Sequence, residues 1–347
     1  MSSESLPRGG RRRFWVRVIL GLVLALALLG LGGFVGYVGV IGSDQFLHPT
    51  GATDCRTPVD RFDWPYEAIN YDITDDATLR TANPDMTSCA TQGTTAGSDV
   101  VTSDGVPIAG WYIPAASGAA PTATVVLVHG YGDNKSGLLK YAALLHEEFN
   151  VVAFDLRNGG RSGSKNTTFG IDEQHDLEAI IDWLVREKAP AHIAVMGNSM
   201  GGGTTLIAAA DDPRIEAVIL DSTHARVVSI LNRRMEVDEG LPSVPTVWAL
   251  MTGIRVRTGI DLDRADPMDY VADLGDRPLL VIHGTADVHD IAAESADLIV
   301  SEAEASGVDV KLQMCEGGTH GQLVEACPGE WATWAVSFLD RVFPPGG

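Results

Sequence analysis

The residues around Ser199 form a motif that is typical of a nucleophilic serine. Ser199 occupies the centre of Gly197-Asn198-Ser199-Met200-Gly201, a G-x-S-x-G pattern. The apolar run 192–196 before it predicts a strand, and the small residues of 202–210 after it predict a helix. A strand that turns sharply into a helix exposes the serine, and flanking glycines prevent collisions with nearby backbone. The pattern therefore predicts a catalytic serine rather than a glycine-rich turn.

A serine of this kind needs a base that takes its proton and an acid that orients the base. In the fold that uses this turn, the chain order is Ser, Asp, His. Asp287 follows the apolar run 277–283, and His320 lies in a glycine-rich loop after the alternating segment 308–315. Catalytic residues of open parallel sheets cluster at such positions after strands. We therefore expect Asp287 to be the acid and His320 the base.

Alternatives exist for both roles. Asp221 ends an apolar run and could serve as the acid from an earlier strand, and Asp290 is a further competitor. Asp287 itself could be only a turn former or a helix cap. His289 is the other histidine beyond Asp287, but it is too close to that acid in sequence to reach back over the serine.

The oxyanion of an acyl-transfer intermediate needs backbone N–H donors, one from the residue after the nucleophile and one from an earlier strand–helix loop. Met200 supplies the first. The apolar run 124–128 ends in His129-Gly130-Tyr131-Gly132, so Tyr131 is expected to supply the other donor. We interpret His129 as a structural hydrogen-bonding residue rather than a second base.

These residues together resemble the alpha/beta-hydrolase superfamily of serine hydrolases, from about Ser98 to Phe343. The motifs that carry the resemblance lie at 129–132, 154–162, 197–201, 283–287 and 318–320. The motif at 154–162 is similar to Asp-x-Arg-Gly-x-Gly-x-Ser, with Asn158 where glycine is usual. Within the superfamily, the chain looks most like membrane-anchored bacterial esterases and aminopeptidases. The resemblance implies a mostly parallel central sheet with helices on both faces and a small cap insertion.

The order of elements predicts one alpha/beta domain over 98–347. Strand-like runs recur at 125–128, 151–155, 192–196, 215–220, 279–283 and 308–314. Before them, 99–102 and 108–113 are expected to form a hairpin. A segment at about 222–275 is too long for a simple crossover loop, and in the superfamily such an insertion often forms a cap over the substrate pocket. The alternative is a crossover helix packed on the sheet.

The N-terminus predicts a membrane anchor. Residues 1–17 are basic, and the run 18–43 is uncharged and long enough to span a bilayer. The positive-inside rule then places the N-terminus in the cytoplasm and the catalytic domain outside. A cleaved signal peptide is the alternative, although only Gly42-Ser43 suggests a cleavage site. Residues 44–97 form an extracytoplasmic linker before the catalytic domain.

The four cysteines suit an oxidising compartment. Pairing by proximity gives Cys55–Cys89 in the linker and Cys315–Cys327 around His320, one of three possible connectivities. The sequence contains no C-x-x-C zinc signature, and the acidic run 261–273 lacks the glycine and spacing of an EF-hand loop. We expect neither a metal nor a cofactor.

The net charge of the chain limits the classes of partner and substrate. The net charge is −21, and removing the first 42 residues, with five Arg and one Glu, leaves −25. So acidic a domain should not bind nucleic acid and should repel anionic lipid surfaces and polyanionic substrates. We expect hydrolysis of an ester or related acyl bond in a small-molecule, peptide or lipid substrate. An aminopeptidase or amidase with the same residues is the alternative, and a non-catalytic binding protein on a hydrolase scaffold is another. No oligomeric state is predicted.

Overall fold

A computed structural model of the chain describes residues 8–71, 74–82, 86, 99–117 and 123–344. Its centre is an eight-stranded sheet in the order β1-β2-β4-β3-β5-β6-β7-β8. The strands are β1 (Glu67–Ile69), β2 (Gly110–Ile113), β3 (Thr124–Val128), β4 (Asn150–Phe154), β5 (Ile193–Asn198), β6 (Ala217–Asp221), β7 (Leu279–Gly284) and β8 (Val310–Cys315). The expected mostly parallel sheet is confirmed.

The direction of the strands brings the loops after them to one edge of the sheet. β1 and β2 run antiparallel to their neighbours, whereas β4, β3, β5, β6, β7 and β8 are parallel. The carboxyl ends of these six strands therefore point the same way, and loops that follow them meet there. β3, β5 and β6 are buried on both faces, which explains why their sequences are continuous apolar runs.

Helices cover both faces of the sheet. The covering helices are α5 (Leu139–Leu145), α6 (Gln174–Lys188), α7 (Met200–Asp211), α10 (Ala296–Ser306) and α12 (Pro328–Val342). Val126 and Val128 of β3 pack with α6, α7 and α10, while Val125 and Leu127 of the same strand pack with α5 and α12. This alternation follows from the period of two along a strand. The shorter helices α3 (Pro58–Phe62), α4 (Thr74–Ala82) and α11 (Leu323–Ala326) lie in connections.

The expected hairpin of 99–102 with 108–113 is wrong in detail. The two segments pair only close to the turn, where Val101 bridges Pro107, the Thr102 N–H donates to the Val106 carbonyl at 2.9 Å and the Ile108 N–H donates to the Val100 carbonyl at 3.0 Å. β2 begins at Gly110 and pairs with β1 and β4 instead. The Asn70 side chain, which follows β1, donates hydrogen bonds to the carbonyls of Val100 and Ile108 at 2.9 and 2.8 Å. β1, which sequence reasoning missed, thus pairs with β2 in the place that was expected for the segment 99–102.

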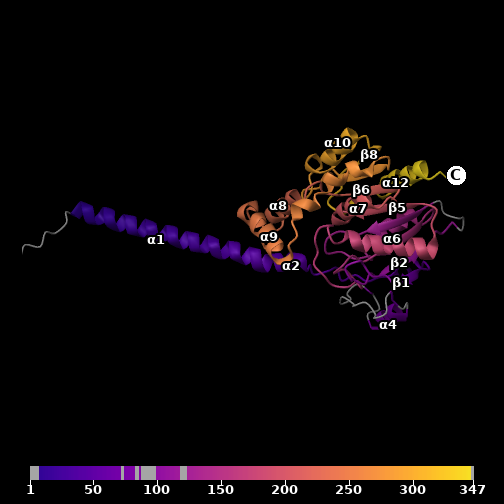
Figure 1. Cartoon of the computed structure of the whole chain (residues 1–347), viewed down its shortest axis with the longest axis horizontal. Coiled ribbons are helices and arrows are strands. Elements are labelled where there is room, and N and C mark those ends of the chain that lie inside the picture. The colour runs from indigo at the N-terminus through magenta and orange to yellow at the C-terminus, as the bar shows by residue number, and fades with distance from the viewer. Residues whose placement is uncertain (1–7, 72–73, 83–85, 87–98, 118–122, 345–347) are drawn as a thin grey trace, which may run out of the picture.

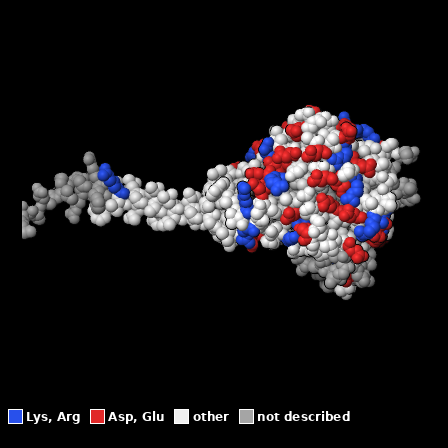
Figure 2. Space-filling model, viewed as in Figure 1, with Lys and Arg blue, Asp and Glu red and all other residues white. Residues whose placement is uncertain are grey.

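A long apolar helix leads into the globular part. It comprises α1 (Arg8–Tyr37), the π-helical turn η1 (Val38–Gly42) and α2 (Ser43–Leu47). Within Trp15–Leu47, the most apolar 18-residue window has a mean hydropathy of 2.7 and is not buried by the rest of the protein. Figure 1 shows α1 projecting away from the sheet, and Figure 2 shows its surface to be uncharged over most of its length. The helix has the length and composition of a membrane anchor or a signal sequence.

The segment 222–275 forms paired helices rather than a single crossover helix. α8 (Val227–Val237) and α9 (Ser243–Thr258) pack on each other, and α9 also contacts η1 and α2. The short 3-10 helices η2 (Leu262–Ala265), η3 (Pro267–Tyr270) and η4 (Ala272–Leu274) lead back towards the sheet, and η5 (Ala292–Glu294) follows β7. We refer to α8 and α9 as the cap helices. They join the end of the N-terminal helix to the loops at the carboxyl edge.

Candidate active site

The turn at Ser199 is strained. β5 ends at Asn198 and α7 begins at Met200, and Ser199 between them has φ 52° and ψ −119°. Positive φ is costly for a residue with a side chain and persists only where the surroundings enforce it. A Cβ atom on Gly201 would collide with the carbonyl oxygens of Val128 and His129, and one on Gly197 would collide with the backbone of Gly201. The two glycines let β5, α7 and β3 come close enough to hold the turn.

The structure brings Ser199, His320 and Asp287 together. Ser199 Oγ lies 2.8 Å from His320 Nε2, and His320 Nδ1 lies 2.8 Å from Asp287 Oδ2. The other oxygen of Asp287 accepts backbone hydrogen bonds from His289 and Asp290 at 3.0 and 2.9 Å. The carboxylate is thus fixed on both sides and can orient one ring nitrogen while the other faces the serine.

Electrostatics favour an ionised acid beside a basic imidazole. Burial alone would lower the pKa of His320, but the hydrogen bond and charge of Asp287, together with the charge of Asp290, raise it above its ordinary value. Burial would raise the pKa of Asp287, but the hydrogen bond and charge of His320 lower it overall. A proton taken from Ser199 would therefore be stabilised on His320.

The rival acids are engaged elsewhere. Asp221 is buried and accepts hydrogen bonds from Trp331 Nε1 at 2.8 Å and from Asn198 Nδ2 at 2.9 Å. Burial raises its pKa. Asp290 accepts a hydrogen bond from the Ser295 hydroxyl. Neither carboxylate is hydrogen-bonded to His320 in the described part of the chain, so geometry favours Asp287.

The loop after β3 lies beside the serine. Gly130 and Tyr131 line the same cavity of about 280 Å³ as Ser199 and His320. Met200 opens α7, so its N–H has no partner within the helix and is free for a ligand. His129 Nε2 accepts a hydrogen bond from the backbone N–H of Leu156 at 2.9 Å, which leaves Nδ1 to donate to the Gly130 carbonyl at 2.8 Å. His129 thus holds this loop in place, as the sequence suggested.

His283, Asp287 and Asp290 are all buried, and their potential ligand atoms lie within 4.8 Å of one another. Such a group could hold a metal ion. However, Asp287 already binds His320 and two backbone N–H groups. His283 Nε2 donates to the Asp290 carbonyl at 2.6 Å. We therefore interpret this group as the support of the Asp287 loop.

Cys315 and Cys327 form a disulfide across the histidine loop. The bond joins the end of β8 to the residue before α12, twelve positions later, and both residues are buried. His320 lies inside the closed loop, so cross-linking restricts the conformations open to its backbone. The other expected pair, Cys55–Cys89, includes Cys89, which lies outside the described residues.

Sequence reasoning missed Arg234. This residue of α8 lines the cavity of Ser199, and its guanidinium lies 5.5 Å from the centre of the Tyr131 ring. Within the described ranges, no carboxylate lies at ion-pair distance from it. An arginine on an amphipathic helix looks in sequence like any solvated charge, so only the packing of the cap helices reveals its place.

Comparisons with known proteins agree with this architecture. Residues 123–248 match a family described as alpha/beta hydrolase fold. The uncharacterized protein YfhR of Escherichia coli K12 is 31% identical over 210 residues, which cover 58% of this chain and 66% of YfhR, just under two thirds of its length. The uncharacterized protein YqkD of Bacillus subtilis is 30% identical over 224 residues, or 63% of this chain and 72% of YqkD.

Solved structures share the fold at lower identity. An esterase from Pyrococcus furiosus gives a TM-score of 0.65 at 22% identity and covers 86% of this chain and 98% of its own. A bacterial membrane phospholipase A, described as a virulence factor, gives a TM-score of 0.52 at 17% identity. It covers 94% of this chain and 98% of its own. At these identities the likeness shows the fold alone.

The Asp287–His320 pair can be tested by NMR titration. We predict that the imidazole pKa of His320 lies above its ordinary value of 6.5. Asp287→Asn should lower that pKa by roughly one to three pH units, because the neighbouring negative charge is lost. Asp221→Asn is the matched control and should leave it nearly unchanged. A large shift in Asp221→Asn with none in Asp287→Asn would assign the acid to the earlier strand.

Proposed function

Since the chain belongs to the alpha/beta-hydrolase fold family, we propose that it is a serine hydrolase that cleaves a carboxylic ester. The hydrogen-bonded series Ser199–His320–Asp287, with both distances at 2.8 Å, is the observation that carries the proposal. The strained turn before α7 supports it, because the turn presents the hydroxyl in front of the sheet edge.

The first half of the reaction forms an acyl-enzyme. Ser199 Oγ attacks the ester carbonyl while its proton passes to His320 Nε2, and Asp287 stabilises the resulting imidazolium. The N–H groups of Tyr131 and Met200 hold the oxyanion. His320 then gives its proton to the leaving alkoxide, the carbon–oxygen bond of the ester breaks, and the alcohol departs.

Water completes the cycle. It attacks the acyl-enzyme as His320 takes its proton, and the second oxyanion forms at the same N–H donors. Collapse of this intermediate returns the proton to Ser199 Oγ and releases the carboxylic acid. These side chains, two backbone N–H groups and one water account for every proton and electron pair.

We favour an ester over an aminoacyl amide because of the charges around the cavity. Two carboxylates line it, but Glu325 pairs with Lys140 at 3.1 Å and Asp133 accepts the N–H of Asn134 at 2.8 Å. Arg234 adds a positive charge that no described carboxylate pairs with. Among the described carboxylates of the lining, a substrate ammonium group would thus find only Asp133 without a cationic partner, and it would be repelled by the guanidinium of Arg234.

The nucleophile can be tested by substitution. Ser199→Ala should lower turnover of p-nitrophenyl butyrate by on the order of 10⁶-fold, and Asp287→Asn by on the order of 10⁴-fold. Ser306→Ala, at an exposed serine of α10, is the control and should keep its activity. Near-native turnover by Ser199→Ala would refute the proposal. Faster hydrolysis of an aminoacyl p-nitroanilide than of the ester would instead favour the amidase.

We also propose that the N-terminal helix stays attached as an anchor, with the catalytic domain outside the cytoplasm. Val38 is buried, and a Cβ atom on Gly253 of α9 would collide with the carbonyl of Gly39, so η1 and α9 are in close backbone contact. Arg257 of α9 also pairs with Asp44. Cleavage at Gly42 would remove the first two contacts, which supports retention of the helix.

Retention of the helix can be measured by intact mass. Protein recovered from the membrane fraction should keep residues 1–42, and protease added outside the membrane should digest the folded domain, because the basic end stays in the cytoplasm. A soluble form that begins after Gly42 would show that the helix is a signal sequence.

A further inference from the structure

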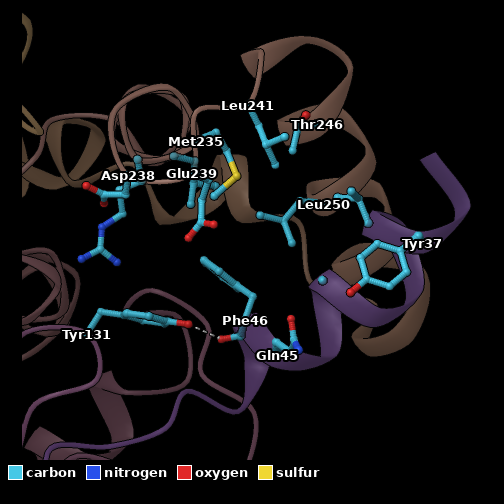
Figure 3. A pocket seen from close by; sticks show the side chains of 14 residues that line it. Tyr37, Gln45, Phe46, Tyr131, Met235, Asp238, Glu239, Leu241, Thr246 and Leu250 are labelled. Carbon is cyan, nitrogen blue, oxygen red and sulfur yellow. Dashed lines mark hydrogen bonds between the residues drawn. The ribbon is translucent and has the colours of Figure 1, made fainter. Parts of the chain in front are cut away.

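A second cavity of about 400 Å³ lies between the N-terminal helix and the cap helices (Figure 3). We call it the anchor–cap cavity. Its lining from the N-terminal segment includes Tyr37, Val38 and Phe46, and its lining from the cap includes Met235, Leu241 and Leu250. These residues are distant in sequence, so the cavity exists only while the end of the N-terminal helix is docked on α8 and α9.

The anchor–cap cavity adjoins the catalytic serine. Tyr131 and Arg234 line both this cavity and the one that contains Ser199 and His320. The Tyr131 hydroxyl donates a hydrogen bond to the Phe46 carbonyl at 2.9 Å, and the two rings stack with centres 5.4 Å apart (Figure 3). The anchor–cap cavity and the cavity of Ser199 therefore lie next to each other and have Tyr131 and Arg234 as common walls.

The walls of the cavity suit a hydrocarbon chain. Leu231, Leu250 and Phe46 offer carbon surface, and Met235 supplies a flexible thioether that points inward in Figure 3. Polar side chains also line the cavity: Asp238, which binds His289 at 2.7 Å, and the exposed Glu239 come from the cap, and Gln45 and Thr246 lie on other sides of it (Figure 3). Because this carbon surface forms a large part of the lining, the cavity can take the hydrocarbon chain of an amphiphile.

Several large apolar side chains of η1 and α9, the elements on either side of the cavity, are exposed. Val40 and Ile41 of η1 are 57% and 43% exposed, and Val244, Trp248 and Val256 of α9 are 78%, 62% and 80% exposed. Trp248 and Val256 lie two steps of four residues apart, which places them along one stripe of the helix. An exposed patch with tryptophan at the end of an apolar helix is typical of a membrane interface.

We propose that the substrate is a membrane-resident acyl ester whose acyl chain lies in the anchor–cap cavity. The chain leaves the bilayer beside the N-terminal helix and passes between that helix and the cap helices, and its carbonyl reaches Ser199. The end of the anchor is then a wall of the substrate site as well as a tether. The proposal rests on the esterase function and adds to it the class of substrate and its route of entry.

The test uses the full chain in phosphatidylcholine vesicles with p-nitrophenyl butyrate and p-nitrophenyl palmitate. Met235→Trp fills the cavity from the cap, and Gly42→Phe fills it from the N-terminal segment. Each should lower the palmitate-to-butyrate ratio of kcat/KM by about ten-fold or more, because the long chain loses its place. Val185→Trp adds the same ring on an exposed site of α6 and should leave the ratio unchanged.

An unchanged ratio in both filling variants, with circular dichroism and melting like the native protein, would overturn the proposal. Using opposite walls guards against one variant failing to fold. Labelling of Ser199 by a fluorophosphonate separates the two proposals. A labelled, butyrate-active enzyme without long-chain preference overturns only the acyl-chain cavity, whereas an unlabelled and inactive one overturns the hydrolase function as well.

Discussion

Ser199 faces His320 because β5 turns into α7 through a residue with φ of 52°, a conformation that its own side chain disfavours. The turn is held by close packing, since side chains at Gly197 or Gly201 would strike the backbone around them. The Ser199 N–H donates to the Asp221 carbonyl at 2.9 Å, which ties the turn to β6. The loops that carry His320 and Asp287 then pack against a serine whose backbone is fixed by these contacts.

The contacts of the N-terminal segment reach the loop that bears Tyr131. The Phe46 carbonyl accepts the Tyr131 hydroxyl, and the Ala52 N–H donates to the Gly132 carbonyl at 2.8 Å. Asn134 Nδ2 donates in turn to the Ala52 carbonyl at 3.0 Å. The loop proposed to hold the oxyanion is therefore built on residues that belong to, or closely follow, the apolar helix. The segment that would attach the protein to a membrane thus also supports the geometry of the site.

Local pattern was enough to predict the parallel strands. The central strands are buried on both faces and must be apolar throughout, and the edge strand β8, which is only partly buried, shows an alternating pattern instead. The order of the motifs along the chain predicted His320 as the base and Asp287 as the acid. Asp221 remained an alternative for the acid because it also ends a strand. The contact that engages Asp221 comes from Trp331, 110 positions away. Arg234 and the anchor–cap cavity were not predictable for the same reason: each depends on how distant helices pack. The hairpin prediction failed beyond its turn, because β1, about forty residues earlier in the chain, pairs with β2 instead.

Trapping the covalent intermediate tests the central claim, that Ser199 carries the acyl group during turnover. The enzyme would be mixed with a p-nitrophenyl ester, quenched in acid during the initial burst of nitrophenol, digested and mapped by mass spectrometry. We expect a mass increase equal to the acyl group on the peptide that contains Ser199, in step with the burst. An acyl group found on another side chain during the burst would contradict the claim.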